Sequence, residues 1–485
     1  MAKKSAPALS KNSILALMCG VGAMTVLDLS VVNVALPSIQ AHLHVKAADL
    51  QWVVVTYGVV VAGFLLLGGR TGDLIGHRKV LVIGIGVLAA ASLVGGLSGS
   101  LDALIVARAG QGFGAALAAP NALAILSRAF AEGPERNRAL GIFGAASGIA
   151  AILGSVCGGL LVQELGWQWV FFINVPLGAV LAGFAWARVP VDAPHRKTAR
   201  TDFGGAVTLT AGLIGITFGV HESIGAGWLS AQTLVPLLGG LGLLGAFVAV
   251  EAHVGSPLIP LAALRKRSLM FANLCAGLLW ASFLGLIYEA TLFTQQVLHY
   301  SPLAAGSATV PIAVLSLGIS AKVAPKVITR FGAAKILAIG MTILGAGLLL
   351  LTRVPSDASY PVDIFPAFSI VGLGLGFAQV AMQIAAFAGV ERDEAGLAGG
   401  AVETSREMGG ALGLALLVSV ALRGTTNGTE VFHRSVLAAA AFAAASAVVA
   451  ILLLRPAERP PSMSACNGQR SEDGGGPQPV QARAA

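Results

Sequence analysis

Long apolar segments recur along the whole chain and alternate with short polar segments. A helix of about 20 apolar residues crosses the hydrocarbon core of a bilayer, which is about 30 Å thick. The pattern therefore predicts an all-α membrane protein with fourteen transmembrane helices. We place these spans at 14–36, 50–69, 79–99, 102–127, 139–162, 168–188, 203–221, 232–250, 270–294, 303–324, 334–352, 363–387, 397–421 and 434–454.

Polar, proline-containing segments near residues 188–200 and 256–267 bracket spans 7 and 8. Six spans precede this pair and six follow it, so we predict two pseudo-symmetric six-helix bundles plus a two-helix insertion. Parallel halves of this kind are typical of transporters that rock about a central site. The predicted parts are a cytoplasmic N-terminus (1–13), an N-terminal bundle (14–188), linkers with spans 7 and 8 (189–267), a C-terminal bundle (268–455) and a disordered cytoplasmic tail (456–485).

The positive charges lie mainly on one side of the predicted membrane. With the N-terminus inside, 25 of the 31 Lys and Arg residues fall in inner segments and 4 fall in outer segments. Because cytoplasmic loops collect Lys and Arg, this bias predicts that both termini are cytoplasmic. The first span is too long for the apolar part of a signal peptide, and it ends in Leu36-Pro37 rather than a cleavage site, so we expect it to be retained.

Composition supports the membrane assignment and argues against a nucleic-acid-binding protein, a metalloprotein or an enzyme. The chain is 56% hydrophobic and 11% charged, whereas soluble domains carry about 25% charged residues. The net charge of +8 follows from the topology bias, and no basic patch with interleaved aromatic residues indicates nucleic acid. The cysteines and histidines form no metal-ligand spacing, and no P-loop or hydrolase motif is present. We expect no cofactor, no metal and no enzymatic activity.

Asp28 stands in the middle of the first apolar span. A carboxylate in such a segment costs a few kcal/mol, so it usually faces a cavity or a partner and carries function. Arg108 lies in span 4 at a similar predicted depth, which makes a pair plausible. Two interpretations stay open: Asp28 and Arg108 couple transport to a proton or cation, or they form a permanent ion pair that locks two helices.

Other polar residues inside the spans are candidates for a substrate cavity. Glu289 could recognise a cationic substrate or pair locally, and amides in lipid need hydrogen-bond partners, which either a cavity or a neighbouring helix supplies. The cavity candidates are Asn33, Glu289, Gln295, Gln379 and Gln383.

The chain resembles the major facilitator superfamily, and within it the fourteen-span drug:proton antiporters. The resemblance covers about residues 10–455 and rests on four motifs in order. These are Leu27-Asp28 to Pro37, Gly69-x-x-x-Asp73-x-x-Gly76-x-Arg78, Leu104-x-x-x-Arg108-x-x-Gln111-Gly112-x-Gly114, and Trp167-x-Trp169 to Asn174-x-Pro176-x-Gly178.

The segment from Gly69 to Lys79 is predicted to be the loop between spans 2 and 3, and it resembles the signature loop of the superfamily. Asp73 is suited to the amino end of a facing helix, where the helix dipole favours an anion. The resemblance implies a partner in the second half, and Arg406 of span 13 is the candidate. We expect Gly69, Asp73, Gly76, Arg78 and Arg406 to form a cytoplasmic gate, unless the basic residues are topology markers only.

Span 5 keeps part of the antiporter motif of this family. Gly154, Gly158 and Gly159 are present, whereas Ser155 stands where the family has proline and Ala150 where it has glycine. The departure leaves antiport and other coupling modes open. The glycine spacing allows close helix packing, and the functional alternative is a hinge.

The expected function is proton-coupled efflux of multiple drugs or antibiotics by alternating access. The expected partners are a small hydrophobic or cationic substrate, protons and the lipid of the cell membrane, with no nucleic acid and a monomeric chain. Three alternatives remain: export of a lipid or a dedicated metabolite, a facilitator that does not exchange protons, and a receptor on the same scaffold.

Overall fold

The structure is a computed structural model that describes residues 10–131, 133–190, 202–253, 267–388 and 395–452. These residues are helical apart from short connections, and no strand occurs among them. Each predicted span overlaps a helix, although the span predicted for 79–99 extends beyond the end of its helix at Gly96. The predicted tail (456–485) and most of the two linkers lie outside the described residues.

The N-terminal helix group consists of the helices before residue 190. A single residue separates α2 from α3, and a single residue separates α7 from α8. Its members are α1 (Lys11–Leu43), α2 (Ala47–Leu50), α3 (Trp52–Ile75), α4 (His77–Gly96), α5 (Leu101–Ala129), α6 (Pro134–Glu164), α7 (Trp169–Phe172) and α8 (Asn174–Arg188). The hairpin that follows consists of α9 (Phe203–Ala226) and α10 (Ala231–His253).

The C-terminal helix group contains three π-helical turns, a conformation that often occurs at functional sites. Its members are α12 (Arg267–Leu292), η1 (Phe293–Val297), α13 (Pro302–Ala308), α14 (Val310–Gly318), η2 (Ile319–Val323), α15 (Ala324–Phe331), α16 (Ala333–Leu351), η3 (Tyr360–Ile364), α17 (Phe365–Phe387), α18 (Ala395–Ala421) and α19 (Gly428–Leu452).

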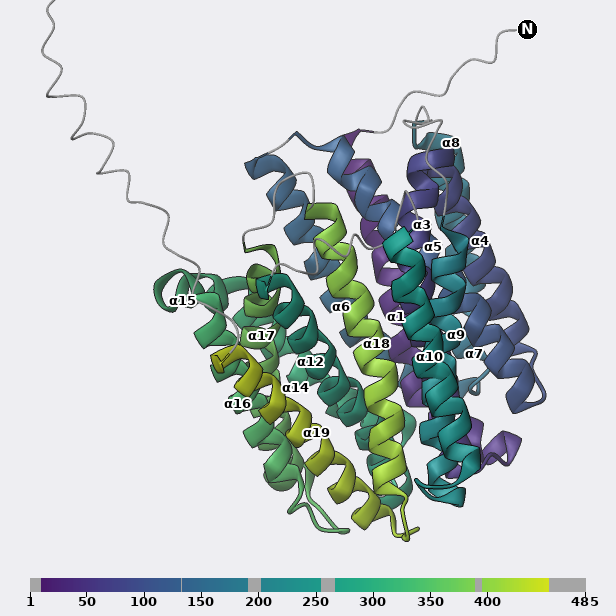
Figure 1. Cartoon of the computed structure of the whole chain (residues 1–485), viewed down its shortest axis with the longest axis vertical. Helices are drawn as coiled ribbons and strands as arrows, with labels where there is room; N and C mark the ends of the chain where they lie inside the picture. The colour runs from purple at the N-terminus through teal and green to yellow at the C-terminus, as the bar shows by residue number, and fades with distance from the viewer. Residues whose placement is uncertain (1–9, 132, 191–201, 254–266, 389–394, 453–485) are drawn as a thin grey trace, which may run out of the picture.

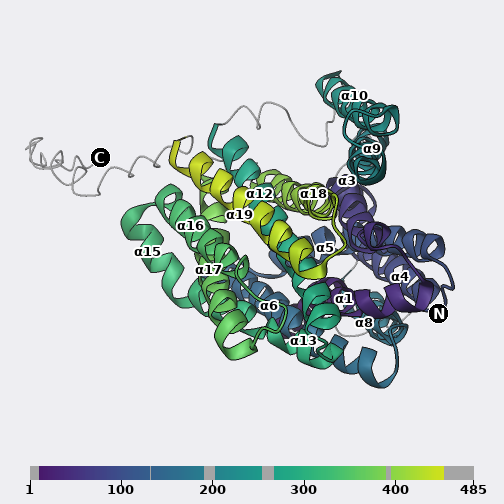
Figure 2. The same cartoon turned by 90° about the horizontal axis from the view of Figure 1, so that it is seen from below.

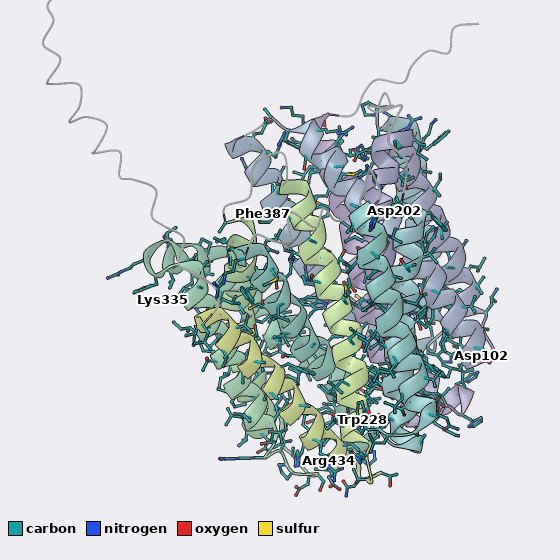
Figure 3. All side chains as sticks on the ribbon, in the orientation of Figure 1. Asp102, Asp202, Trp228, Lys335, Phe387 and Arg434 are labelled. Atoms are coloured by element: carbon teal, nitrogen blue, oxygen red, sulfur yellow. The ribbon has the colours of Figure 1, made fainter. Side chains whose placement is uncertain are left out.

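Twelve helical stretches in the described part of the chain are long and apolar enough to cross a membrane. Helices α5 and α18 are also long, but they carry Arg108 and Arg406 and are not among these twelve. Phe387 and Asp202 lie at one end of the helices and Trp228 and Arg434 at the other (Figure 3). We name these the inner and the outer end, because the charge bias predicts that the first is cytoplasmic.

The helices gather into two packed groups with the hairpin at the side (Figures 1 and 2). One hydrophobic core draws only on residues between 14 and 189, and another only on residues between 269 and 450. A third core joins α1 and α3 to α9, α12 and α18. The groups meet mainly where α3 packs on α18 and where α6 packs on α13 and α14.

The predicted loop from Gly69 to Lys79 is almost entirely helical, which corrects the sequence-based prediction. Helix α3 continues to Ile75 and α4 begins at His77, so that only Gly76 lies between them. Its φ of 102° is favourable only for glycine. Gly332, with a φ of 87°, makes the equivalent corner between α15 and α16.

Candidate functional site

Asp28 lies at the centre of a buried polar network between α1, α4, α5 and α8. Arg108 Nη1 of α5 donates to Asp28 Oδ2 at 2.7 Å. Gln111 Nε2 donates to Asp28 Oδ1 at 2.7 Å, and Asn174 Nδ2 donates to the same oxygen at 2.6 Å. The four side chains have no exposed surface. Equal depth thus correctly predicted that Asp28 and Arg108 meet.

Arg108 is held from several sides. Its Nε donates to the carbonyl oxygen of Val53 at 2.8 Å, and its Nη1 also donates to Gln111 Oε1 at 2.9 Å. The guanidinium carbon lies 4.5 Å from the centre of the Tyr57 ring, a distance typical of a cation–π contact. Arg108 therefore links α5 to α3 as well as to α1.

The network suits an ionised carboxylate, because all three neighbours of Asp28 donate hydrogen bonds. Three members of the network had no role predicted from the sequence: Gln111, Asn174 and Ser92, whose Oγ accepts from Gln111 Nε2 at 2.8 Å. The signal was present, since an amide inside an apolar span needs a buried partner. Which partner it finds depends on how the helices are rotated.

Tyr57, whose ring contacts Arg108, lies on α3, the helix that packs on α18 of the C-terminal group. Its neighbour in the sequence, Gly58, leaves room for Glu407 of α18, because a β-carbon at residue 58 would lie 3.4 Å from Glu407 Oε2. A second carboxylate is thus placed on α18, opposite the part of α3 that carries Tyr57 and Gly58. The two acids belong to different helix groups.

The predicted gate pair, Asp73 with Arg406, is not formed in this structure. Asp73 Oδ1 lies 3.3 Å from His77 Nε2 and 3.4 Å from Arg128 Nη2, both in the N-terminal helix group. Arg406 donates to Glu403 at 2.7 Å and lies 3.9 Å above the Trp280 ring of α12. Arg406 thus contributes to packing between α12 and α18.

The other predicted gate residues line the same inner corner. Gly69 faces Pro120, since a β-carbon at residue 69 would lie 3.5 Å from the proline ring. Arg78 Nη1 donates to the carbonyl oxygen of Val189 at 2.9 Å, and its guanidinium lies 5.0 Å from the Trp186 ring. Arg78 therefore joins α4 to α8 in this structure.

Two of the cavity candidates, Asn33 and Gln295, donate hydrogen bonds to backbone carbonyl oxygens of α1. Asn33 is 2% exposed, and its Nδ2 donates to the carbonyl oxygen of Leu29 in the same helix. Gln295 of η1 donates to the carbonyl oxygen of Val34 at 2.9 Å, and Gln296 donates to Gln40 at 2.7 Å. The two amides of η1 therefore join the helix groups at their outer ends.

The remaining cavity candidates differ in exposure. Glu289 is 3% exposed on α12 and lies beside Ser435 of α19, within the C-terminal helix group. Gln379 of α17 is partly exposed, and Gln383 of the same helix is exposed near the inner end. Of the cavity candidates, Gln383 is the one that is exposed, while Gln379 and Gln295 are partly exposed.

The glycines of α6 lie against helices of both groups. A β-carbon at Gly154 would stand 2.7 Å from Ser30, and one at Gly158 would stand 2.9 Å from the Val31 Cα, both in α1. A β-carbon at Gly159 would stand 2.5 Å from the carbonyl oxygen of Pro302 in α13. The partial antiporter motif thus lies on a helix that packs closely against two neighbours, α1 and α13.

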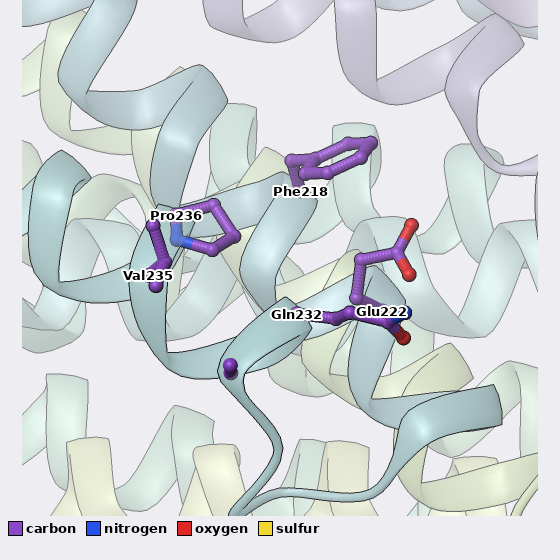
Figure 4. Close-up of a pocket in the computed structure, with 6 residues that line it drawn as sticks. Phe218, Glu222, Gln232, Val235 and Pro236 are labelled. Carbon is purple, nitrogen blue, oxygen red and sulfur yellow. The ribbon is translucent and has the colours of Figure 1, made fainter.

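A surface depression occurs on the hairpin, away from the Asp28 network. Phe218 and Glu222 of α9 line it together with Gln232, Val235 and Pro236 of α10 (Figure 4). It is mostly apolar and lies outside the contacts that join the two helix groups. We assign it no part in the site.

Comparison with known proteins gives concordant results. The sequence pattern of the Major Facilitator Superfamily matches residues 18–414. The cephamycin export protein CmcT of Amycolatopsis lactamdurans is 39% identical over 85% of each chain. The puromycin resistance protein pur8 of Streptomyces alboniger is 36% identical over 83% of this chain and 80% of its own.

Solved structures agree on the fold. The POT family transporter PepTSo matches 95% of this chain and 99% of its own, with a TM-score of 0.67 and 16% identity. The likeness at this identity concerns the fold alone. This shared fold and the family match together confirm the resemblance that the sequence motifs indicated. The chain therefore belongs to the Major Facilitator Superfamily, as a multi-pass membrane transporter of small molecules rather than an enzyme.

Proposed function

We propose that this protein exports antibiotics or similar hydrophobic molecules in exchange for protons, by alternating access between its two helix groups. The observation that carries this proposal is the fully buried Asp28–Arg108 pair. Arg108 also bonds to α3, the helix whose Gly58 faces Glu407 of the opposite helix group. A carboxylate that is ionised in one conformation and protonated in another provides the coupling that an antiporter needs.

The present contacts fit the stage of the cycle in which the outer end is closed. Gln295 and Gln296 bridge the helix groups there, and α6 presses against α13. Asp28 has no exposed surface in this arrangement and accepts three hydrogen bonds. We propose that opening of the outer end separates these contacts and admits a proton to Asp28.

The proposal includes the predicted topology. Fourteen crossings would place both termini in the cytoplasm, with α5 and α18 as the two charged crossings in the interior of their groups. The parts are those predicted above, an N-terminal bundle (14–188), the hairpin with its linkers (189–267) and a C-terminal bundle (268–455), working as a monomer in the cytoplasmic membrane. Gln379 and Gln383 are the proposed cavity residues nearest to the inner end.

Transport in proteoliposomes tests the proposal. An imposed proton gradient should drive uptake of puromycin or a lipophilic cation by wild-type protein, and Asp28→Asn should abolish the gradient-driven part. Asp102→Asn is the matched control, because Asp102 is exposed at the start of α5 and should leave the flux unchanged. Full gradient-driven flux in Asp28→Asn would remove Asp28 from the coupling mechanism.

Dedicated export of a single antibiotic is the second candidate. The two relatives described above are each named for one compound, cephamycin or puromycin. A transport panel that contains both antibiotics and an unrelated lipophilic cation separates the candidates. Saturable flux of one compound alone supports dedicated export, whereas flux of chemically unrelated compounds supports multidrug export.

A further inference from the structure

A second polar cluster lies at the inner corner between α3 and α4, and it centres on His77, which is buried with Asn121 while Asp73 is exposed. The side chain of His77 is 2% exposed. Its Nδ1 lies 2.7 Å from Asn121 Oδ1 of α5, and its Nε2 lies 3.3 Å from Asp73 Oδ1. Apart from this ion-pair contact, Nε2 is a buried nitrogen without a hydrogen-bond partner among the described residues.

The orientation of the Asn121 amide is fixed by its other contacts. Its nitrogen lies 2.9 Å from the carbonyl oxygen of Gly68 and 2.7 Å from that of Leu117. Carbonyl oxygens only accept hydrogen bonds, so both contacts require the NH₂ group of the amide. Asn121 Oδ1 therefore faces His77, and as an oxygen it can only accept from His77 Nδ1.

This assignment determines the tautomer of His77. The proton that Nδ1 donates to Asn121 is the single ring proton of a neutral imidazole, so neutral His77 would turn the lone pair of Nε2 toward Asp73. The buried Nε2 lone pair would then face an Asp73 carboxylate oxygen at 3.3 Å, although the Asp73 side chain itself is 58% exposed. A second proton, bound between Nε2 and the carboxylate, replaces this repulsion with an ion pair.

The backbone keeps the cluster compact. A β-carbon at Gly72 would lie 1.8 Å from Asn121 Oδ1 and 2.5 Å from His77 Nδ1, so only glycine allows the amide and the ring to meet across α3. Gly76 makes the turn between the end of α3 at Ile75 and the start of α4 at His77. The geometry of His77 is thus set by the two glycines that flank Asp73.

We propose that His77 and Asp73 form a proton-binding site at the inner end, in which Asn121 fixes the ring so that Nε2 takes up the proton. Arg128 of α5 and Arg70 of α3 also face Asp73, and Arg78 and Lys79 lie on α4 beside His77. With the proton bound, the imidazolium and Arg128 hold Asp73 within the N-terminal helix group. Loss of the proton removes the attraction of the imidazolium and leaves those of Arg128 and Arg70.

The site deepens the proposed function, and its role in the transport cycle rests on it. In an antiporter a proton leaves toward the cytoplasm before the inner end closes. Release from His77 would free Asp73 to turn toward the C-terminal helix group, which is the gate contact that the sequence motif implies. The site would thereby allow closure of the inner end only after the proton has left.

Nitrogen NMR of protein labelled with ¹⁵N-histidine tests the site directly, with the His77 signals assigned by their loss in His77→Gln. We expect both ring nitrogens to be protonated at pH 5.5, and Nδ1 alone to be protonated above the transition. Asp73→Asn should move the transition to lower pH by about one unit, a tenfold loss of proton affinity. Asp102→Asn should not move it.

Two NMR results would overturn the site. One is a neutral ring from pH 5.5 to 9, and the other is a high-pH form with the proton on Nε2. Because this measurement does not use transport, it separates the two proposals. If His77 titrates but no proton-driven drug flux occurs, the proton-binding site is supported and the proposed function is contradicted. If proton-driven flux occurs but His77 does not titrate, the proposed function is supported and the site is contradicted.

Spin-label distances test the effect on the gate. Cysteines at Ala131 and Lys326, both exposed near the inner ends of the two helix groups, are labelled in protein that lacks the native cysteines. The wild-type distance distribution should shift toward closure as pH rises through the His77 transition. His77→Gln should remove this shift. A shift that persists unchanged in His77→Gln would exclude His77 from gate control.

Discussion

Gly159 of α6 passes Leu303 of α13 so closely that a β-carbon at residue 159 would lie 2.6 Å from the Leu303 Cα. The two residues belong to different helix groups and meet near the outer end. Backbone-to-backbone contact of this kind cannot adjust by a change of side-chain rotamer. Any separation of the two helix groups at the outer end must therefore break this contact.

Gly159→Ala is expected to open the outer end. The added methyl group would meet the backbone of α13, and such overpacking typically costs about 1–3 kcal/mol. Spin labels on cysteines at Asp102 and Asp357, which are exposed at the outer ends of the two groups, should report longer distances.

Gly144→Ala is the control on the same helix, because a β-carbon there would meet nothing within 4 Å. Equal distance distributions in the two alanine variants would contradict the assigned role of Gly159.

Asp28 and Arg108 should be energetically coupled. Removing one partner of a buried ion pair typically costs about 3–5 kcal/mol, since the other charge is left without compensation. Asp28→Asn and Arg108→Met should each lower the midpoint of thermal unfolding, and the double variant should lower it by less than the sum. Additive midpoint shifts would indicate that the pair contributes little to stability.

Arg406 should be coupled to Trp280 and independent of Asp73. The guanidinium lies 3.9 Å from the Trp280 ring centre, whereas Asp73 is held by His77 and Arg128. In double-mutant cycles on thermal unfolding, Arg406→Gln should be non-additive with Trp280→Leu and additive with Asp73→Asn. Coupling between positions 73 and 406 would instead support the gate pair that the sequence motif predicts.

The hairpin should stabilise closure of the outer end. At the outer end of α9, His221 Nε2 lies 3.2 Å from Asp49 Oδ1 of the N-terminal group, and Ser223 Oγ lies 2.6 Å from Ser419 Oγ of the C-terminal group. Because α9 bonds to both groups, Ser223→Ala should lengthen the distance between labels at residues 102 and 357.

Thr208→Val is the matched control for the hairpin, since the Thr208 hydroxyl bonds only within α9. An unchanged distance distribution in Ser223→Ala would show that the hairpin does not contribute to closure.

The sequence alone determined the helices and their order. Length and hydrophobicity are local properties, so each predicted segment overlaps a helix in the described chain. The acid in the first span and the arginine in the fourth could also be matched, because depth follows from position along a helix. Sequence motifs were sufficient to predict the family that the comparisons confirm.

The tertiary structure decided which partner each polar side chain meets. Asn174 and Ser92 approach the Asp28 network through the rotation of α8 and α4, while Glu289 turns toward α19 rather than a cavity. Asp73 pairs within its own group because α3 continues to Ile75 and turns at Gly76. Hydrophobic patterns are nearly uniform around helices in a membrane, so rotation is set by packing and hydrogen bonds between helices, which appear only when the chain is folded.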